Sequence, residues 1–148
     1  MNTKVINEVF NNLEQGKFDM AGNKISDNFS TTLMGKKLDK SQYLETYRLL
    51  LQGIPDLKLE LKDVKQEGDN IKAKLVLSGT QSKMIPAMKN TWNEITPTGK
   101  KIDGLIYDLA ITLKNDRIEE VRTVDTNKGM MVGLLNKLGL DYSKFQAN

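Results

Sequence analysis

The chain has 148 residues, no cysteine and no histidine, and its 22 Lys and Arg residues exceed its 19 Asp and Glu residues to give a net charge of +3. The missing Cys and His exclude a thiol nucleophile, an imidazole base, a Ser-His-Asp triad and a Cys/His zinc site. We therefore expect neither a metal nor a cofactor. The length suits one domain, and no Pro-, Gly- or Ser-rich stretch divides residues 1–148.

Charge and hydropathy patterns also limit the partners. Basic and acidic residues are interspersed, and aromatic residues make up only 6% of the chain, so we do not expect binding to nucleic acid. No apolar run has the length of a membrane span, and polar residues interrupt the first twelve positions, unlike a secretory signal. The expected location is the cytoplasm, with no membrane partner.

Two helices are predicted near the N-terminus. Residues 5–13 place apolar side chains on one helical face, and Gly16 is suited to end that helix. A short second helix is expected within residues 18–29, followed by an extended segment at residues 30–34 and a turn at residues 35–37.

A third helix is predicted from signals at both of its ends. Asp39 and Gln42 have the spacing of a capping box, and apolar residues then recur at helical spacing. Gly53, with Pro55 just beyond it, is expected to end this helix.

The rest of the chain predicts two β-hairpins and a last helix. Residues 57–77 alternate with a period of two around a turn at residues 67–70, and residues 101–124 form a second hairpin around residues 114–116. Residues 128–138 predict a short apolar helix. Helices followed by antiparallel strands predict an α+β domain with a curved sheet packed on helices.

Four short segments resemble one known family. They are Gly53-Ile54-Pro55-Asp56-Leu57, which enters the first long strand, Val76-Leu77-Ser78-Gly79-Thr80, Pro97-Thr98-Gly99-Lys100, which enters the third strand, and Asn115-Asp116-Arg117-Ile118-Glu119-Glu120. In this order the chain resembles the SnoaL-like polyketide cyclases of the nuclear transport factor 2-like (NTF2-like) superfamily. The resemblance implies a cone-shaped barrel, in which a curved mixed or antiparallel sheet wraps around N-terminal helices, with a C-terminal helix, a cavity between sheet and helices, and commonly a homodimer.

Asp108 is the catalytic candidate that the resemblance implies, because the cyclases carry a general acid/base aspartate in the strand after the Pro-Thr-Gly turn. The residues themselves agree: the strand face with Ile106, Asp108 and Ala110 is smaller than the opposite face with Tyr107 and Leu109, and it suits the wall of a cavity. A carboxyl group that loses water there is suited to proton exchange. The alternative is a structural aspartate satisfied by hydrogen bonds.

The chain departs from the family at the residue that pairs with this aspartate, which in the cyclases is usually a histidine or another polar group. Many relatives carry a histidine-tryptophan pair near the positions of Val121 and Arg122, and this chain has no histidine. Arg122 is therefore a candidate to stabilise an enolate electrostatically, with a solvent-facing arginine as the alternative. Tyr43, Tyr47 and Tyr107 are candidate hydroxyl donors to a bound carbonyl, by resemblance to ketosteroid isomerases of the same fold. Tyr47 lies on the apolar face of its helix, so its ring is otherwise a core residue.

A long connection at residues 80–96 carries Met84, Met88 and Trp92 at a spacing of four. A short helix after Pro86 would place these three side chains on one face, as a lid over an apolar ligand. Packing in the core or in a dimer interface is the alternative.

Three functions remain open on these grounds. The first is cofactor-independent acid/base catalysis, of the cyclase or isomerase type, on a hydrophobic carbonyl compound with Asp108 as the acid/base. The second is a protein that binds a hydrophobic small molecule in the same cavity without turnover. The third is a dimeric interaction scaffold in which the chain's own side chains fill the cavity.

Overall fold

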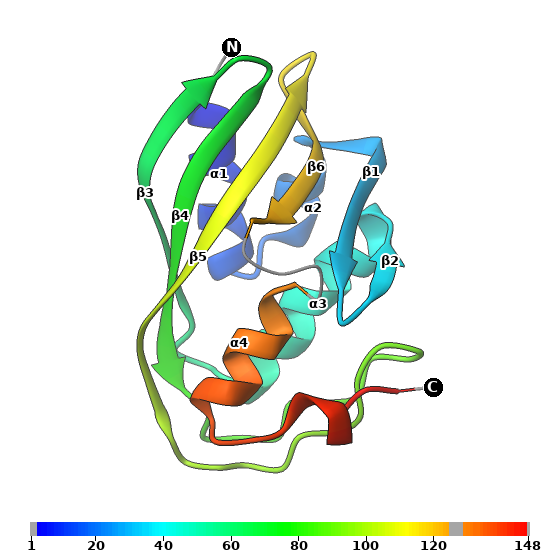
Figure 1. Cartoon of the computed structure of the whole chain (residues 1–148), viewed down its shortest axis with the longest axis vertical. Helices are drawn as coiled ribbons and strands as arrows, with labels where there is room; N and C mark the ends of the chain where they lie inside the picture. The colour runs from blue at the N-terminus through cyan, green and yellow to red at the C-terminus, as the bar shows by residue number, and fades with distance from the viewer. Residues whose placement is uncertain (1–2, 125–128, 148) are drawn as a thin grey trace.

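A curved six-stranded sheet bends around the N-terminal helices in the computed structural model, which describes residues 3–124 and 129–147 (Figure 1). The strands are β1 (Ile25–Leu33), β2 (Lys36–Leu38), β3 (Lys58–Glu67), β4 (Asn70–Thr80), β5 (Lys101–Lys114) and β6 (Arg117–Thr123). The helices are α1 (Lys4–Glu14), α2 (Phe18–Gly22), α3 (Lys40–Gly53) and α4 (Met130–Lys137), with the short 3-10 helix η1 (Tyr142–Lys144). None of these helices is long and apolar enough to cross a membrane.

The sheet is mixed, with the strand order β2-β1-β6-β5-β4-β3. Only β1 and β6 run parallel; every other neighbouring pair is antiparallel. The pairing of β1 with β6 is irregular. Ile25 lies opposite Ile118 and Ser30 lies opposite Glu120, so β1 advances by more residues than β6 between these two pairs. The α+β class and the two predicted hairpins are confirmed.

The helices lie inside the curve of the sheet (Figure 1), and the Tyr47 hydroxyl of α3 contacts Met130 at the start of α4. The apolar residues predicted for the first helix are all buried on the inner side of α1, and Gly16 follows its end with a positive φ of 74°. That left-handed conformation is the one glycine adopts without steric cost. The predicted end of the first helix is therefore confirmed.

The capping box of α3 is also present. The Asp39 carboxylate accepts a hydrogen bond from the Gln42 backbone N–H at 2.9 Å, and the Gln42 side-chain oxygen accepts one from the Asp39 N–H at 2.9 Å. Two of the free N–H groups at the start of the helix are thus satisfied. This cap fixes where α3 begins, and hence which side chains it turns toward the sheet.

The second predicted helix is too long. Only α2 is helical, while Ile25 and Phe29 lie in β1, where both are buried. A spacing of four brings two residues to one face of either a helix or a strand, so the apolar pattern alone did not separate the two. Lys36 and Lys37, predicted as part of a turn, belong to the short strand β2, and the turn itself lies at Met34 and Gly35.

We predict that Asp39→Ala lowers the free energy of unfolding by about 1 kcal/mol, because the variant loses an N-cap hydrogen bond. Asp39→Asn is the matched control, since asparagine caps helices about as well. Denaturant unfolding of the three proteins measures the difference. Equal stabilities of the Ala and Asn variants would show that the cap does not hold α3.

Candidate functional site

An apolar pocket lies between α3, α4 and the inner face of the sheet. Its lining residues come from β1, β2, α3, β4, β5, β6 and the start of α4: Thr31, Thr32, Leu33, Leu38, Tyr43, Thr46, Tyr47, Leu75, Tyr107, Leu109, Val121, Thr123, Gly129 and Met130. The free volume is about 30 Å³, which is room for roughly one or two water molecules. The predicted cavity between sheet and helices is thus nearly filled by its own side chains.

Two tyrosines of α3 provide the central hydroxyl groups. Tyr43 and Tyr47 lie one helical turn apart, and their rings meet edge to face with centroids 5.2 Å apart. Phe29 packs against Tyr43 at 4.7 Å, and Phe10 packs edge-on against Tyr47 at 6.4 Å. These contacts hold both rings, so the positions of the two hydroxyls are set by packing.

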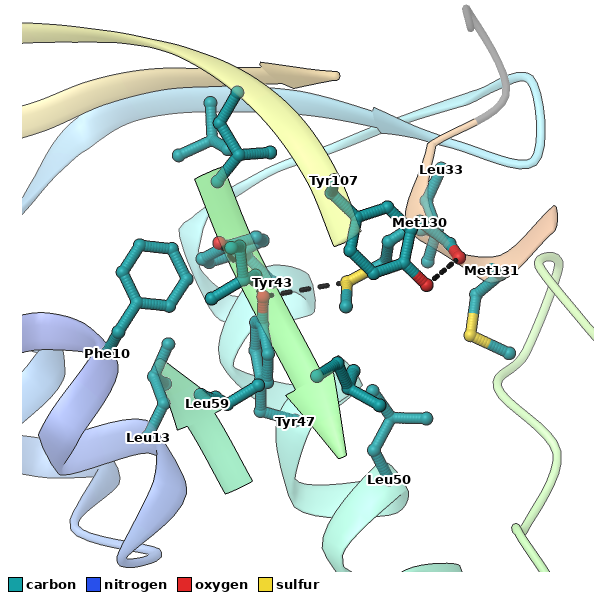
Figure 2. Packing of buried hydrophobic residues seen from close by; sticks show 14 of the residues in the cluster. Phe10, Leu13, Leu33, Tyr43, Tyr47, Leu50, Leu59, Tyr107, Met130 and Met131 are labelled. Atoms are coloured by element: carbon teal, nitrogen blue, oxygen red, sulfur yellow. Dashed lines mark hydrogen bonds between the residues drawn. The ribbon is translucent and has the colours of Figure 1, made fainter. Parts of the chain in front are cut away.

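The hydroxyls of Tyr43 and Tyr47 form a chain that ends at Met130, and Figure 2 shows its last bond, from Tyr47 to the Met130 sulfur. The hydroxyl oxygens of Tyr43 and Tyr47 are 3.3 Å apart, and the Tyr47 hydroxyl donates to the Met130 sulfur at 3.5 Å. Since that bond uses the Tyr47 proton, the Tyr47 oxygen accepts from Tyr43. The Tyr107 hydroxyl donates to the Met130 carbonyl oxygen at 2.8 Å, which ties β5 to the first turn of α4.

Burial keeps these phenols neutral. Desolvation raises the pKa of Tyr47 to about 12, although the hydrogen bond from Tyr43 acts in the opposite direction. Desolvation also raises the pKa of Tyr43 well above its usual value, and the charge and hydrogen bond of Tyr47 add to this effect. The pKa of Tyr107 is raised by burial first and by Tyr47 second.

The pocket therefore offers hydrogen-bond donors on an apolar wall. Among the described residues that line it, none is a carboxylate, a lysine or an arginine. No group of three or more carboxylates able to hold a metal occurs in the described part of the chain. A neutral phenol can donate a hydrogen bond to a carbonyl oxygen, but at neutral pH it does not abstract a proton.

Asp108 and Ile106 lie outside this pocket, so the expected strand parity was wrong. The bulky row of β5, with Tyr107 and Leu109, is the row that faces the helices, whereas Asp108 borders a shallow depression beside Lys72 and Lys74 on the outer face. Ile106 is 56% exposed on that outer face. The large apolar residues of β5 lie on the inner face because they bury more apolar surface there than the smaller residues of the other face would.

The predicted lid helix is also wrong. Residues 81–100 contain no helix, and isolated β-bridges join Ile85 with Ile95 and Met88 with Trp92. Trp92 is fully buried and its indole N–H donates to the Pro86 carbonyl at 2.9 Å, while Met84 is 40% exposed. Trp92 is therefore a core residue, as the alternative to a lid predicted.

Met88 is the member of this group that lies nearest to the pocket. Its sulfur accepts a hydrogen bond from the Thr46 hydroxyl at 3.6 Å, and Thr46 is a pocket residue. Met88 thus packs behind the pocket wall. No local pattern signals this contact, because Thr46 and Met88 belong to distant segments of the chain.

Arg122 lies in a polar groove that adjoins the pocket. This groove has a volume of about 270 Å³ and is lined by Ser30, Thr31, Thr32, Lys37, Glu120, Val121, Arg122 and Thr123. Of the candidates named from the sequence, the three tyrosines Tyr43, Tyr47 and Tyr107 line the apolar pocket itself. Met130, which belongs to the apolar helix predicted at residues 128–138, also lines the apolar pocket.

Comparisons with known proteins agree with this architecture. The sequence model of the SnoaL-like polyketide cyclases matches residues 4–133. A SnoaL-like polyketide cyclase structure from Agrobacterium tumefaciens has a TM-score of 0.64 and 19% identity, covering 84% of this chain and 91% of its own. A candidate polyketide cyclase from Bacillus cereus gives a TM-score of 0.67 and 18% identity, with coverages of 93% and 79%.

An NTF2-like protein of unknown function from Cytophaga hutchinsonii gives a TM-score of 0.53 and 13% identity over 80% of this chain and 83% of its own. No curated protein matches the chain. At these identities the solved structures establish the fold, and the predicted NTF2-like fold is confirmed.

We predict that stability falls as the pH rises above 10, because the unfolded chain ionises its tyrosines near pH 10 and the folded chain does not. Each such phenol lowers the free energy of unfolding by about 1.4 kcal/mol per pH unit until its own folded pKa is reached, which is about 12 for Tyr47. Below pH 10 the full stability is present. Denaturant unfolding between pH 8 and pH 11.5 measures the slope, and Tyr47→Phe should reduce it. The same slope in the variant would contradict the burial of a protonated Tyr47.

Proposed function

The chain belongs to the SnoaL-like polyketide cyclase family, and on that premise we propose that it binds a small, apolar carbonyl compound in the pocket between α3 and the sheet, without converting it. The observation that carries the proposal is the buried hydroxyl chain that ends on a methionine sulfur. A carbonyl oxygen on a bound ligand would take the place of that sulfur.

The acceptor at the end of the chain supports this exchange. A thioether sulfur is a weak hydrogen-bond acceptor, whereas a carbonyl oxygen is a strong one. The Tyr47 ring is held by Phe10 and Tyr43, so its hydroxyl is already aimed at the place of the acceptor. A ligand therefore gains a hydrogen bond without the cost of ordering the donor.

Space for the ligand comes from the Met130 side chain. The free volume of about 30 Å³ is far below the roughly 300 Å³ of an ordinary ligand pocket. Methionine has three rotatable side-chain bonds and moves between rotamers readily. Displacement of the Met130 thioether would enlarge the pocket and free the Tyr47 hydroxyl in the same movement.

The placement of Asp108 supports binding without turnover. An acid/base residue has to come within hydrogen-bond reach of the proton that it moves, directly or through one water. Asp108 borders the outer depression with Lys72 and Lys74, and it is not among the residues that line the apolar pocket. The described pocket wall holds no other carboxylate to replace it.

We predict saturable binding of acetophenone, a small aryl ketone, to the wild-type protein. The methyl resonance of Met130 should shift in NMR titrations, because its side chain leaves the pocket. Tyr47→Phe should weaken binding about fivefold, the factor that corresponds to one hydrogen bond of about 1 kcal/mol. Met130→Ala should bind more tightly than wild type, since the space is already open.

Two results would contradict this proposal. Binding that is confined to Met130→Ala would show that only an artificial cavity accepts the ketone. Conversion of a bound carbonyl compound at a rate that Asp108→Asn abolishes would establish the enzyme instead. The thermal unfolding midpoints of all variants serve as controls for folding.

We further propose that the outer face of the sheet pairs two copies of the chain into a homodimer. Ile106 on β5 is 56% exposed, and Val124 just after β6 is 46% exposed. Val76, which lies opposite Ile106 on β4, continues the same apolar surface. Exposed apolar residues gathered on one face favour a protein interface.

We predict that Ile106→Glu shifts the protein from dimer to monomer, because the variant places a charge in the apolar contact. Sedimentation equilibrium measures the mass of each form. Met20→Glu is the matched control, since Met20 is 54% exposed on α2, away from this face. A wild-type monomer, or a dimer that survives Ile106→Glu, would refute this interface.

A further inference from the structure

A polar groove between β1 and β6 adjoins the apolar pocket. The groove and the pocket share the lining residues Thr31, Thr32, Val121 and Thr123. The groove is by far the larger of the two, at about 270 Å³ against about 30 Å³. The groove and the pocket therefore lie side by side.

The groove arises from the irregular pairing of the two parallel strands. The paired positions end at Ser30 opposite Glu120, although β1 continues to Leu33 and β6 to Thr123. Beyond this point the hydroxyl of Thr31 donates to the Val121 carbonyl at 2.6 Å, a side-chain contact in place of a backbone ladder. The strands therefore separate where their pocket residues lie.

The walls of the groove carry a surplus of positive charge. Lys37 on β2 and Arg122 on β6 are both exposed, and Glu120 is the one acidic residue among the described lining residues. Neither Lys37 nor Arg122 forms an ion pair with any residue in the described part of the chain. Two cations that form no ion pair with a described residue, beside one anion, favour a ligand with a single negative charge.

We propose that this groove is the entrance to the apolar pocket, and that Lys37 and Arg122 bind the carboxylate of a ligand whose apolar body occupies the pocket. The inference rests on the proposed binding function and narrows its ligand to apolar monoanions. Arginine suits a carboxylate because its planar guanidinium donates two parallel hydrogen bonds. The hydroxyls of Ser30 and Thr32 add donors beside the cations.

Binding of 4-oxo-4-phenylbutanoate and of 4-oxo-4-phenylbutanamide tests the proposal, because both probes carry the aryl ketone for Tyr47 and they differ in charge and hardly in shape. Calorimetric titrations of the wild-type protein should give tighter binding of the carboxylate. Arg122→Gln and Lys37→Gln should each reduce that preference roughly two- to fivefold, the range expected for an exposed charge pair, and leave amide binding unchanged. Raising the ionic strength from about 20 mM to about 0.5 M should remove most of the preference.

Two further variants sharpen the test. Glu120→Gln should increase the preference for the carboxylate, because it removes the anion of the groove. Lys58→Gln makes the same charge change as Lys37→Gln, but on β3 at the opposite edge of the sheet, and should have no effect. A loss of preference in Lys58→Gln equal to that in Lys37→Gln would overturn the site, because only net charge would then matter.

The outcomes separate this inference from the proposed function. If both probes bind equally well, the cationic entrance is wrong and the apolar pocket stands. If neither binds, the pocket fails as a ligand site and the entrance fails with it. Tighter binding of the carboxylate that depends on both Lys37 and Arg122 supports the two proposals together.

Discussion

The buried hydroxyl of Tyr47 is the constraint on which the site depends. A phenol inside an apolar core costs free energy unless its hydroxyl finds a partner, and Tyr47 finds two, Tyr43 as donor and the Met130 sulfur as acceptor. This contact fixes α4 against α3, and Tyr107 fixes α4 against the sheet. The helix that closes the apolar pocket is thus tied to α3 and to the sheet by two phenols in addition to its buried apolar side chains, and the weaker of the two bonds is the one to sulfur.

The long connection between β4 and β5 also supports the pocket, because its Met88 packs against Thr46 of the pocket wall. Gln81 is fully buried, and its amide donates to the carbonyls of Lys83 and Thr96 and accepts from the backbone and hydroxyl of Thr98. One side chain therefore joins both ends of residues 81–100. Trp92 fills the space beneath them, so a segment without a helix is still rigid enough to support Met88 and Thr46. A movable lid is not needed if Met130 itself occupies the ligand position.

The irregular pairing of β1 with β6 places the polar groove beside the apolar pocket. Antiparallel pairing of β3 to β6 gives a continuous wall, and the single parallel pair, β1 with β6, separates after a short distance. The polar groove lies at that separation, with cations on its walls and the apolar pocket behind it. In our proposals the apolar body of a ligand and its charged group are therefore bound by two adjoining parts of one site, while the outer face of β4 and β5 remains free for a second copy of the chain.

The sequence by itself determined the features that depend on neighbouring residues. The apolar face of α1, the capping box of Asp39 and Gln42, the hairpin turns and the α+β class are local patterns, and all were predicted. Only the tertiary structure decided which face of β5 is inside: a strand offers two faces, and the bulky row took the inner one because it buries more apolar surface, which left Asp108 outside. It also decided that Met88 and Trp92 pack without a helix, and that Lys37 and Arg122 share a groove. These depend on contacts between residues far apart in the chain, which local spacing does not encode.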